Sequence, residues 1–558
     1  MASPTTSFSL GASPTNPAVS PPGEFRRRSS KACEHCRAKR TRCSGTSPCE
    51  ACVALGLGDG CYVRDKARPR RAPAASKRRK KSSSPNGIGP RPGEAHAHFV
   101  RDVELAIDSW LESTGNSERL SLPGPSRLSS FTATALPADR SDLAVLEDRL
   151  LVSYRAVQHF EFLSPSRVAD LYARHRDLPE SLVPDQRALL ASVLCLGRLS
   201  ELSFELTKEG GNRMRPIAPG EAREDVTYFR MALGHLDAFG AASCTALCAL
   251  HCLHLFAQII GGPEDTRELL GAMAWQAREL GLHRRETAAA YPAADRVGQL
   301  FFSTMYKDTW FATLVDAPPF TRWGEYDYDP SVSTDVPQTQ GILSRLAVLE
   351  SELLSQIHSG RVDTTTPDFV LSTESRWWPL MRECGDERND RLLASIHPYA
   401  DIRFNWIRLL LRAPCLSHPT LGASSTPIVA RSLSRILHTY ASLAATDLFH
   451  PCYAQLRRIV TCGQLLVLCH TARELGRHEA EELFAVFLGL VKEHRGKFDF
   501  IPQLIASFES VGELLGLVIP AAPQPAARFS VDLPIMFDYS LPTWFDTFYE
   551  PHLAPEPI

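Results

Sequence analysis

The 558-residue sequence predicts a small cysteine-rich segment near the N-terminus and a large all-α domain, joined by segments that do not pack. Three observations predict this organisation. Cysteines and cations crowd into residues 31–65, and apolar residues recur at a spacing of three to four through residues 141–520. The remaining segments are rich in Pro, Ser, Gly and like charges, a composition typical of disorder. The chain is also longer than one usual domain.

The charge is unevenly distributed along the chain. The formal net charge is −2, but residues 26–81 hold eighteen Lys and Arg against four Asp and Glu, which leaves +14 there and −16 elsewhere. A basic block on an acidic chain indicates that a polyanion binds at one end. The N-terminus lacks the pattern of a secretion leader, and the apolar runs are too short to span a bilayer. We therefore expect an intracellular protein with reduced thiols and no membrane partner.

Residues 1–30 are rich in Ser, Pro and Thr and are expected to be disordered. The next segment, residues 31–65, contains six cysteines with the spacing C-x2-C-x6-C-x5-C-x2-C-x8-C: Cys33, Cys36, Cys43, Cys49, Cys52 and Cys61. Zinc prefers four tetrahedral ligands, and thiolates suit it well. Two zinc ions need eight ligand positions, so two of the six sulfurs would bridge. The first cysteine of each C-x2-C half, Cys33 and Cys49, is the natural bridge.

Two other interpretations of the cysteines stay open at this point. The four cysteines of the two C-x2-C pairs alone would form a one-zinc ribbon, which leaves Cys43 and Cys61 unused. A disulfide framework is the second alternative, although the absence of a secretion leader disfavours it. The Lys and Arg around the cysteines favour thiolates, because neighbouring cations lower the pKa of a thiol.

The cysteine block resembles the fungal zinc binuclear cluster, the DNA-binding domain of fungal transcription regulators. The family's first half reads C-x2-C-R-x-[KR]-[KR]-x-[KR]-C, here CRAKRTRC at residues 36–43, and Pro48 precedes the fourth cysteine. The resemblance implies that a short helix after Cys36 enters the major groove of double-stranded DNA and reads a CGG triplet.

The basic residues of this helix are the candidate DNA contacts: Arg37, Lys39, Arg40 and Arg42. By position, Lys39 and Arg40 match the family's base-reading pair, and Lys and Arg suit the O6 and N7 acceptors of guanine. The other two are expected to contact phosphates, which supply affinity without sequence information. The alternative, that all four contact phosphates only, stays open.

Residues 66–98 form a basic linker that is expected to be disordered. It contains the run KRRKK, made of Lys77, Arg78, Arg79, Lys80 and Lys81. Such a run is typical of a nuclear import signal, so we expect the nucleus as the location. A further phosphate-binding arm is a compatible alternative.

Residues 99–113 predict a short helix with Phe99, Val103, Ala106 and Trp110 on one face. The family often dimerises through a coiled coil after the cluster, so this helix is a candidate dimerisation element. It spans fewer than two heptads, which leaves a homodimer as an open alternative. Residues 114–140 are expected to be a linker.

Residues 141–520 predict an all-helical domain. In RELLGAMAWQARELGLHRRE (residues 267–286), apolar side chains recur on one face, and Gly281 is placed to end the helix. This segment and RVGQLFFSTMYKDTWFATLVDAPPF (residues 296–320) resemble the fungal-specific regulatory domain, or middle homology domain, of many such factors. The likeness spans roughly residues 145–420. The fold class is therefore a zinc-binuclear-cluster DNA-binding domain plus a large all-α regulatory domain, joined by disordered linkers.

The helical domain lacks the sequence motifs of an enzyme, including H-E-x-x-H, G-x-S-x-G and a P-loop. We therefore expect no enzymatic activity. Cys244, Cys248 and Cys252 recur at a helical spacing beside His251. We interpret them as a buried face, because a Cys without a partner packs as a small hydrophobe. A metal or redox sensor is the alternative.

Residues 521–558 predict an acidic aromatic activation tail. FSVDLPIMFDYSLPTWFDTFYE (residues 529–550) holds seven aromatics, four acids and no Lys or Arg. Acids interleaved with bulky apolar residues are typical of segments that dock into a groove of a transcription coactivator. The candidate contacts are Phe537, Trp544, Phe545 and Phe548. A tail that packs back on the helical domain stays open.

These features together predict a sequence-specific DNA-binding transcription regulator of RNA polymerase II genes, and we expect an activator. Its cofactor would be zinc, two ions per chain, and its partners CGG-containing DNA and coactivators. The alternative function is a zinc-stabilised interaction adaptor or corepressor that binds DNA weakly.

Overall fold

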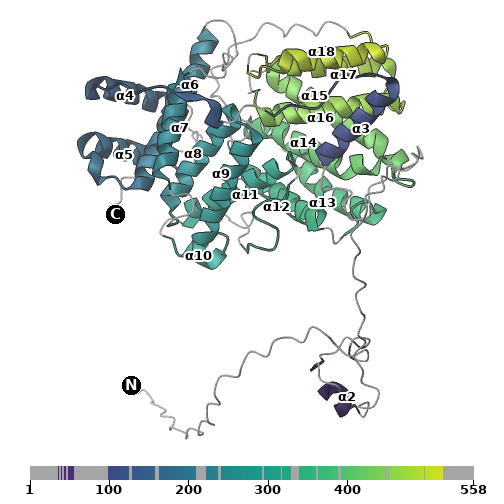
Figure 1. Ribbon diagram of the computed structural model, residues 1–558, viewed down its shortest axis with the longest axis horizontal. Coiled ribbons are helices and arrows are strands. Elements are labelled where there is room, and N and C mark those ends of the chain that lie inside the picture. The colour runs from purple at the N-terminus through teal and green to yellow at the C-terminus, as the bar shows by residue number, and fades with distance from the viewer. Residues whose placement is uncertain are drawn as a thin grey trace, which may run out of the picture. The chain divides into compact units, whose positions relative to one another are not determined.

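The computed structural model describes residues 36, 39, 43–44 and 48–55 near the N-terminus, and residues 99–519 with gaps at 125–127, 157–161, 209–221, 237–240, 292–293, 316, 328–337, 360–361, 387–390, 417, 446–448, 450 and 496. The chain divides into two units, Met1–Gly87 and Ile88–Ile558 (Figure 1). In the first unit, the short helix α2 spans Glu50–Ala54.

The second unit, here called the helical unit, confirms the predicted all-helical character. Its α-helices are α3 (Phe99–Thr114), α4 (Arg140–Ala156), α5 (Pro165–Asp177), α6 (Pro184–Lys208), α7 (Glu224–His235), α8 (Cys244–Ile260), α9 (Pro263–Glu279), α10 (Arg285–Ala289), α11 (Ala294–Ala312), α12 (Gln338–Ser359), α13 (Pro367–Asp386), α14 (Arg391–Arg412), α15 (Gly422–Ala445), α16 (Tyr453–Thr471), α17 (Arg477–Lys492) and α18 (Ile501–Leu514).

Short elements complete the helical unit. The 3-10 turns are η2 (Leu128–Ser130), η3 (Pro179–Ser181) and η5 (Ala413–Cys415). The two-residue strands β1 (Thr132–Ala133) and β2 (Ala222–Arg223) pair in parallel, with Thr132 opposite Ala222. No helix within the described residues has both the length and the apolar character that crossing a bilayer requires.

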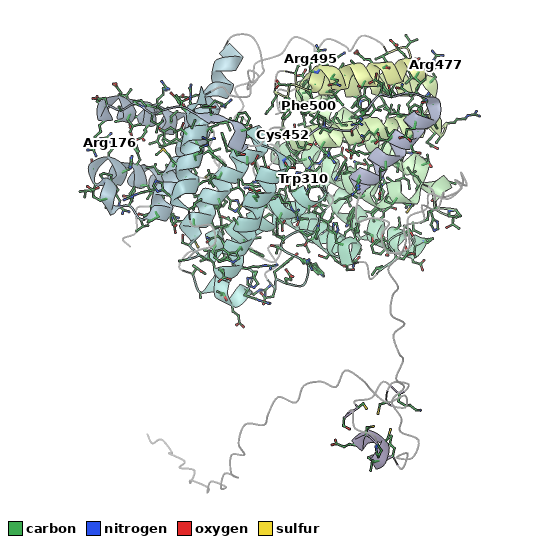
Figure 2. All side chains as sticks on the ribbon, viewed as in Figure 1. Arg176, Trp310, Cys452, Arg477, Arg495 and Phe500 are labelled. Carbon is green, nitrogen blue, oxygen red and sulfur yellow. The ribbon has the colours of Figure 1, made fainter. Side chains whose placement is uncertain are left out.

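One hydrophobic core runs through the helical unit from Phe99 to Leu517. In Figure 1, α4–α8 gather on one side, α14–α18 on the other, and α9 and α11 lie between them. The side chains of α8 from Ala246 to Ile260 are all buried, which is expected of a helix that is apolar all round. Trp310 of α11 lies in the interior of the unit, as Figure 2 shows, and is 2% exposed.

The predicted end of α9 at Gly281 is confirmed. The last helical residue is Glu279, and Gly281 adopts the left-handed conformation with φ +69°. The amide of Leu282 donates to the carbonyl of Ala277 over 2.9 Å, as in a helix C-terminus closed by glycine. A Cβ at this position would lie 2.7 Å from Cγ2 of Thr287, so both the backbone and the packing require glycine.

The region expected to hold a separate helix and a linker differs from that expectation. Helix α3 packs against α16, and the ring of Phe99 lies edge-on to Trp406 with centroids 5.6 Å apart. Leu120 and Leu122 are buried in the same core, and Nε2 of Gln464 donates to the Leu120 carbonyl over 2.9 Å. Of the face proposed for dimerisation, Phe99 and Val103 are therefore buried by the chain itself, whereas Trp110 is half-buried and Ala106 is exposed. The Pro- and Ser-rich composition excludes long helices here, but it does not exclude packing.

Candidate metal centre and nucleic-acid interface

The second C-x2-C pair is positioned by the start of α2. Cys49 precedes the helix in an extended conformation, and its carbonyl accepts hydrogen bonds from the amides of Cys52 (2.9 Å) and Val53 (3.0 Å). This turn places both cysteines of the pair in one buried cluster. The amide of Glu50 donates to Oγ of Ser44 over 3.1 Å, which links the start of α2 to the residue after Cys43.

Three thiols converge in this unit. The Sγ atoms of Cys36, Cys49 and Cys52 all lie within 4.8 Å of one another, and the three residues are at most 1% exposed. The Sγ atoms of Cys36 and Cys49 are 3.6 Å apart. Two thiolates on one tetrahedral zinc, each about 2.3 Å from the ion, stand about 3.8 Å apart. A disulfide would need about 2.05 Å. The spacing therefore fits zinc ligation.

The described part of the structure brings together three of the six predicted ligands. Cys36 comes from the first half of the motif, and the other two come from the second half. Cys43 is half-buried and packs against this cluster. Cys33 and Cys61 lie outside the described residues.

One of the candidate DNA contacts falls on a described residue. Lys39 has helical backbone, as does Cys36, and its side chain is exposed. This agrees with the short helix that the resemblance implies after Cys36. The other three candidate DNA contacts, Arg37, Arg40 and Arg42, lie outside the described residues. So do the basic run of residues 77–81 and the candidate activation residues Phe537, Trp544, Phe545 and Phe548.

Two of the three cysteines in the α8 stripe are buried in the helical core, and Cys244 is half-buried. Cys248 is 2% exposed and Cys252 is fully buried, and burial raises the pKa of each thiol to about 12. A protonated thiol is neither a metal ligand nor a nucleophile at neutral pH. The burial of Cys248 and Cys252 agrees with the core interpretation, and within the described residues the stripe forms no group of candidate metal ligands.

Sequence reasoning missed a polar group beside this stripe. The buried imidazole of His251 has Oγ1 of Thr304 2.9 Å from Nε2 and Nζ of Lys307 2.9 Å from Nδ1. Burial lowers the pKa of Lys307 to about 7. The adjacent Lys307 and Asp308 between the aromatic residues of α11 are the signal in the sequence that could have revealed it.

Comparison with known proteins identifies the cysteine block. Residues 31–70 match the model of the fungal Zn(2)-Cys(6) binuclear cluster domain. Such a domain binds two zinc ions, which confirms the predicted cofactor and disfavours the one-zinc ribbon. Proteins with this domain are typically DNA-binding transcription regulators, not enzymes, and are generally nuclear. No curated protein and no solved structure matches the chain, and the match covers no part of the helical unit.

Proposed function

We propose that this chain is a sequence-specific, zinc-dependent transcription regulator of RNA polymerase II genes that reads CGG triplets. The observation that carries this proposal is the three-thiol cluster within a segment that matches the zinc cluster domain. The same segment lies in the part of the sequence with a charge of +14, so it is suited to binding a polyanion.

We assign the zinc ligands as Cys33, Cys36, Cys43, Cys49, Cys52 and Cys61, with Cys33 and Cys49 as the bridges. The position of Cys49 is compatible with a bridge, because its Sγ lies within 4.8 Å of Cys36 from the first half and of Cys52 from the second, a property that it shares with Cys52. Bound zinc supplies the cross-links that hold this short segment folded. The thiolates of the chain supply the ligands, and the neighbouring Lys and Arg offset their negative charge.

Base reading is assigned to Lys39 and Arg40, and phosphate contact to Arg37 and Arg42. The exposed side chain of Lys39 on helical backbone supports this assignment, because a helix is the element that fits the major groove. We assign nuclear import to the run of residues 77–81. We further propose that residues 521–558 recruit coactivators, which makes the protein an activator.

The decisive experiment is in vitro selection of double-stranded DNA from random sequence by the full chain loaded with zinc. We expect enrichment of CGG triplets. Lys39→Ala should cost about 1–3 kcal/mol on the selected site and relax the preference for guanine. Arg42→Ala is the matched control, because loss of a phosphate contact should weaken binding to all sequences about equally.

Two results would contradict the proposal. A protein that holds two zinc ions but enriches no sequence would favour the adaptor or corepressor function. A Lys39→Ala protein with an unchanged ratio of specific to non-specific affinity would show that this residue contacts phosphate only.

A further inference from the structure

The N-cap residue of α2 does not cap the helix with its side chain. The first amides of an α-helix have no partner inside it, and a Ser, Thr, Asp or Asn at the N-cap position usually supplies an acceptor. Here Cys49 occupies that position, and its side chain makes no capping hydrogen bond. Its Sγ belongs to the three-thiol cluster. The side chain that would ordinarily cap the helix is therefore placed for the metal.

Ser44 supplies an acceptor from the other half of the cysteine motif. Its Oγ accepts a hydrogen bond over 3.1 Å from the amide of Glu50, the first residue of α2. Ser44 directly follows Cys43, which is the third of the six predicted ligands and packs against the thiol cluster. The hydrogen bond therefore joins the first half of the motif to the second, and no metal ion takes part in it.

This hydrogen bond acts on the segment that holds the second thiol pair. Helix α2 has five residues, Glu50–Ala54, and a helix this short is not stable through its own hydrogen bonds alone. Cys52 lies in its first turn, and the amide of Cys52 donates to the Cys49 carbonyl over 2.9 Å. An acceptor at the first helical amide therefore stabilises the turn that carries both thiols.

We propose that Ser44 is a positioning residue for the metal centre. Its hydroxyl caps α2 and thereby holds Cys49 and Cys52 against the thiol of Cys36. In this role it contacts neither the metal nor DNA, and it makes the separation of the two halves of the motif rarer. The inference rests on the zinc ligands proposed above, but not on the proposed reading of CGG triplets.

The test measures how fast the full chain, loaded with zinc, transfers the metal to the chromogenic chelator 4-(2-pyridylazo)resorcinol. Ser44→Ala should transfer zinc about 5-fold faster, which corresponds to the loss of about 1 kcal/mol from a helix cap. Ser44→Thr and Ser44→Asp should stay within about 2-fold of the native rate, because each keeps an oxygen that can accept the hydrogen bond. This rescue separates the hydrogen bond from a general effect of changing the side chain.

Val53→Ala is the matched control for a change close to the same turn. The side chain of Val53 lies on α2 but is 57% exposed, and alanine is the best helix former, so zinc transfer should not become faster. Affinity for double-stranded DNA in excess zinc is the second measurement. It should stay within about 2-fold of the native value in Ser44→Ala, because the lost hydrogen bond lies within the protein.

Three outcomes would overturn the proposal. Zinc transfer from Ser44→Ala at the native rate would show that the hydroxyl does not hold the thiol pair. Equally fast transfer from the Ala, Thr and Asp variants would show that the hydrogen bond is not what matters at this position. Native transfer with a weaker affinity for DNA would show that the hydroxyl contacts a phosphate instead. A chain that behaves as expected towards the chelator but enriches no DNA sequence would contradict only the function proposed above.

Discussion

The helical unit contains a buried ion pair between Arg403 of α14 and Glu350 of α12. Arg403 is 1% exposed and Glu350 is fully buried. The guanidinium donates from Nε to one carboxylate oxygen over 2.9 Å and from a second nitrogen to the other oxygen. It also lies over the rings of Tyr306 and Trp310, 4.0 Å and 4.7 Å from their centroids. This pair fixes the relative position of α12 and α14 beside α11.

Removing one partner of this ion pair should therefore destabilise the protein strongly. Arg403→Met leaves the Glu350 carboxylate buried and unpaired, which should lower the free energy of unfolding by about 3–5 kcal/mol. Arg376→Met is the matched control, because Arg376 makes the same two-bond contact with Glu352, at 2.8 Å and 2.6 Å, but is 51% exposed. It should cost at most about 1 kcal/mol. Urea titration followed by circular dichroism measures both, and equal shifts of the two midpoints would contradict the argument.

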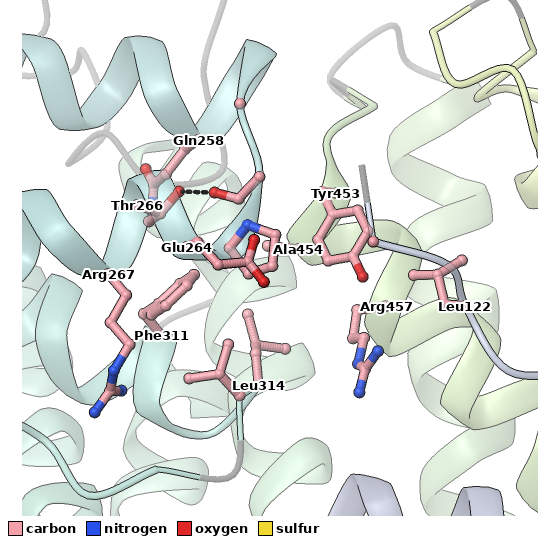
Figure 3. A pocket seen from close by; sticks show the side chains of 15 residues that line it. Leu122, Gln258, Glu264, Thr266, Arg267, Phe311, Leu314, Tyr453, Ala454 and Arg457 are labelled. Carbon is pink, nitrogen blue, oxygen red and sulfur yellow. Dashed lines mark hydrogen bonds between the residues drawn. The ribbon is translucent and has the colours of Figure 1, made fainter. Parts of the chain in front are cut away.

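The predictability of single residues depends on how local their environment is. The buried cysteines of α8 follow from a helical spacing within nine residues, and the zinc ligands follow from spacing within one short segment. The pocket beside Gln258 (Figure 3) could not be predicted, because its other wall comes from α16, almost two hundred residues later in the chain. A sequence pattern shows which face of a helix is apolar, but not which distant polar atoms that face meets.

At the scale of elements, α3 shows the same distinction between a local pattern, which the sequence predicts, and a distant packing partner, which it does not. The predicted helix of residues 99–113 is observed as Phe99–Thr114. The predicted apolar stripe holds at Phe99 and Val103, but it continues through Ile107 and Leu111, whereas Ala106 is exposed. The helix was predictable from its periodicity. Its partner α16 was not, because the intervening Pro- and Ser-rich segment indicates a linker when considered alone.

The burial of α3 yields a test that separates packing from dimerisation. Ile107 is fully buried, so Ile107→Ala should lower the free energy of unfolding by about 2–4 kcal/mol. Leu105 is 55% exposed on the same helix, so Leu105→Ala should change the free energy of unfolding by at most about 0.5 kcal/mol. Denaturant unfolding measures both. If instead Ile107→Ala changes the sedimentation coefficient and leaves the unfolding midpoint in place, this face would be a dimer interface.

At the scale of the whole molecule, the composition predicted a small cysteine-rich segment and a large helical part. The helical character of the large part and the zinc cluster near the N-terminus are both confirmed. The resemblance of the helical unit to a fungal-specific regulatory domain stays a prediction. Charge follows the same division, because +14 lies in residues 26–81 and −16 in the rest of the chain. Such a chain can hold DNA at one end while the rest stays clear of the phosphates.

This division of charge predicts that the acidic end of the chain activates transcription. Residues 529–550, with seven aromatics and four acids, should activate a reporter when fused to an unrelated DNA-binding domain. Replacing Trp544, Phe545 and Phe548 by Ala should reduce that activity at least about 10-fold, because aromatic anchors supply most of the affinity in a groove. Replacing Asp538 and Asp546 by Asn should reduce the reporter activity less, because exposed charges mainly raise the rate at which the segment meets its partner. A stably expressed fusion that stays silent would exclude the activator role, whereas an active fusion beside a silent intact chain would show that the rest of the chain masks the tail.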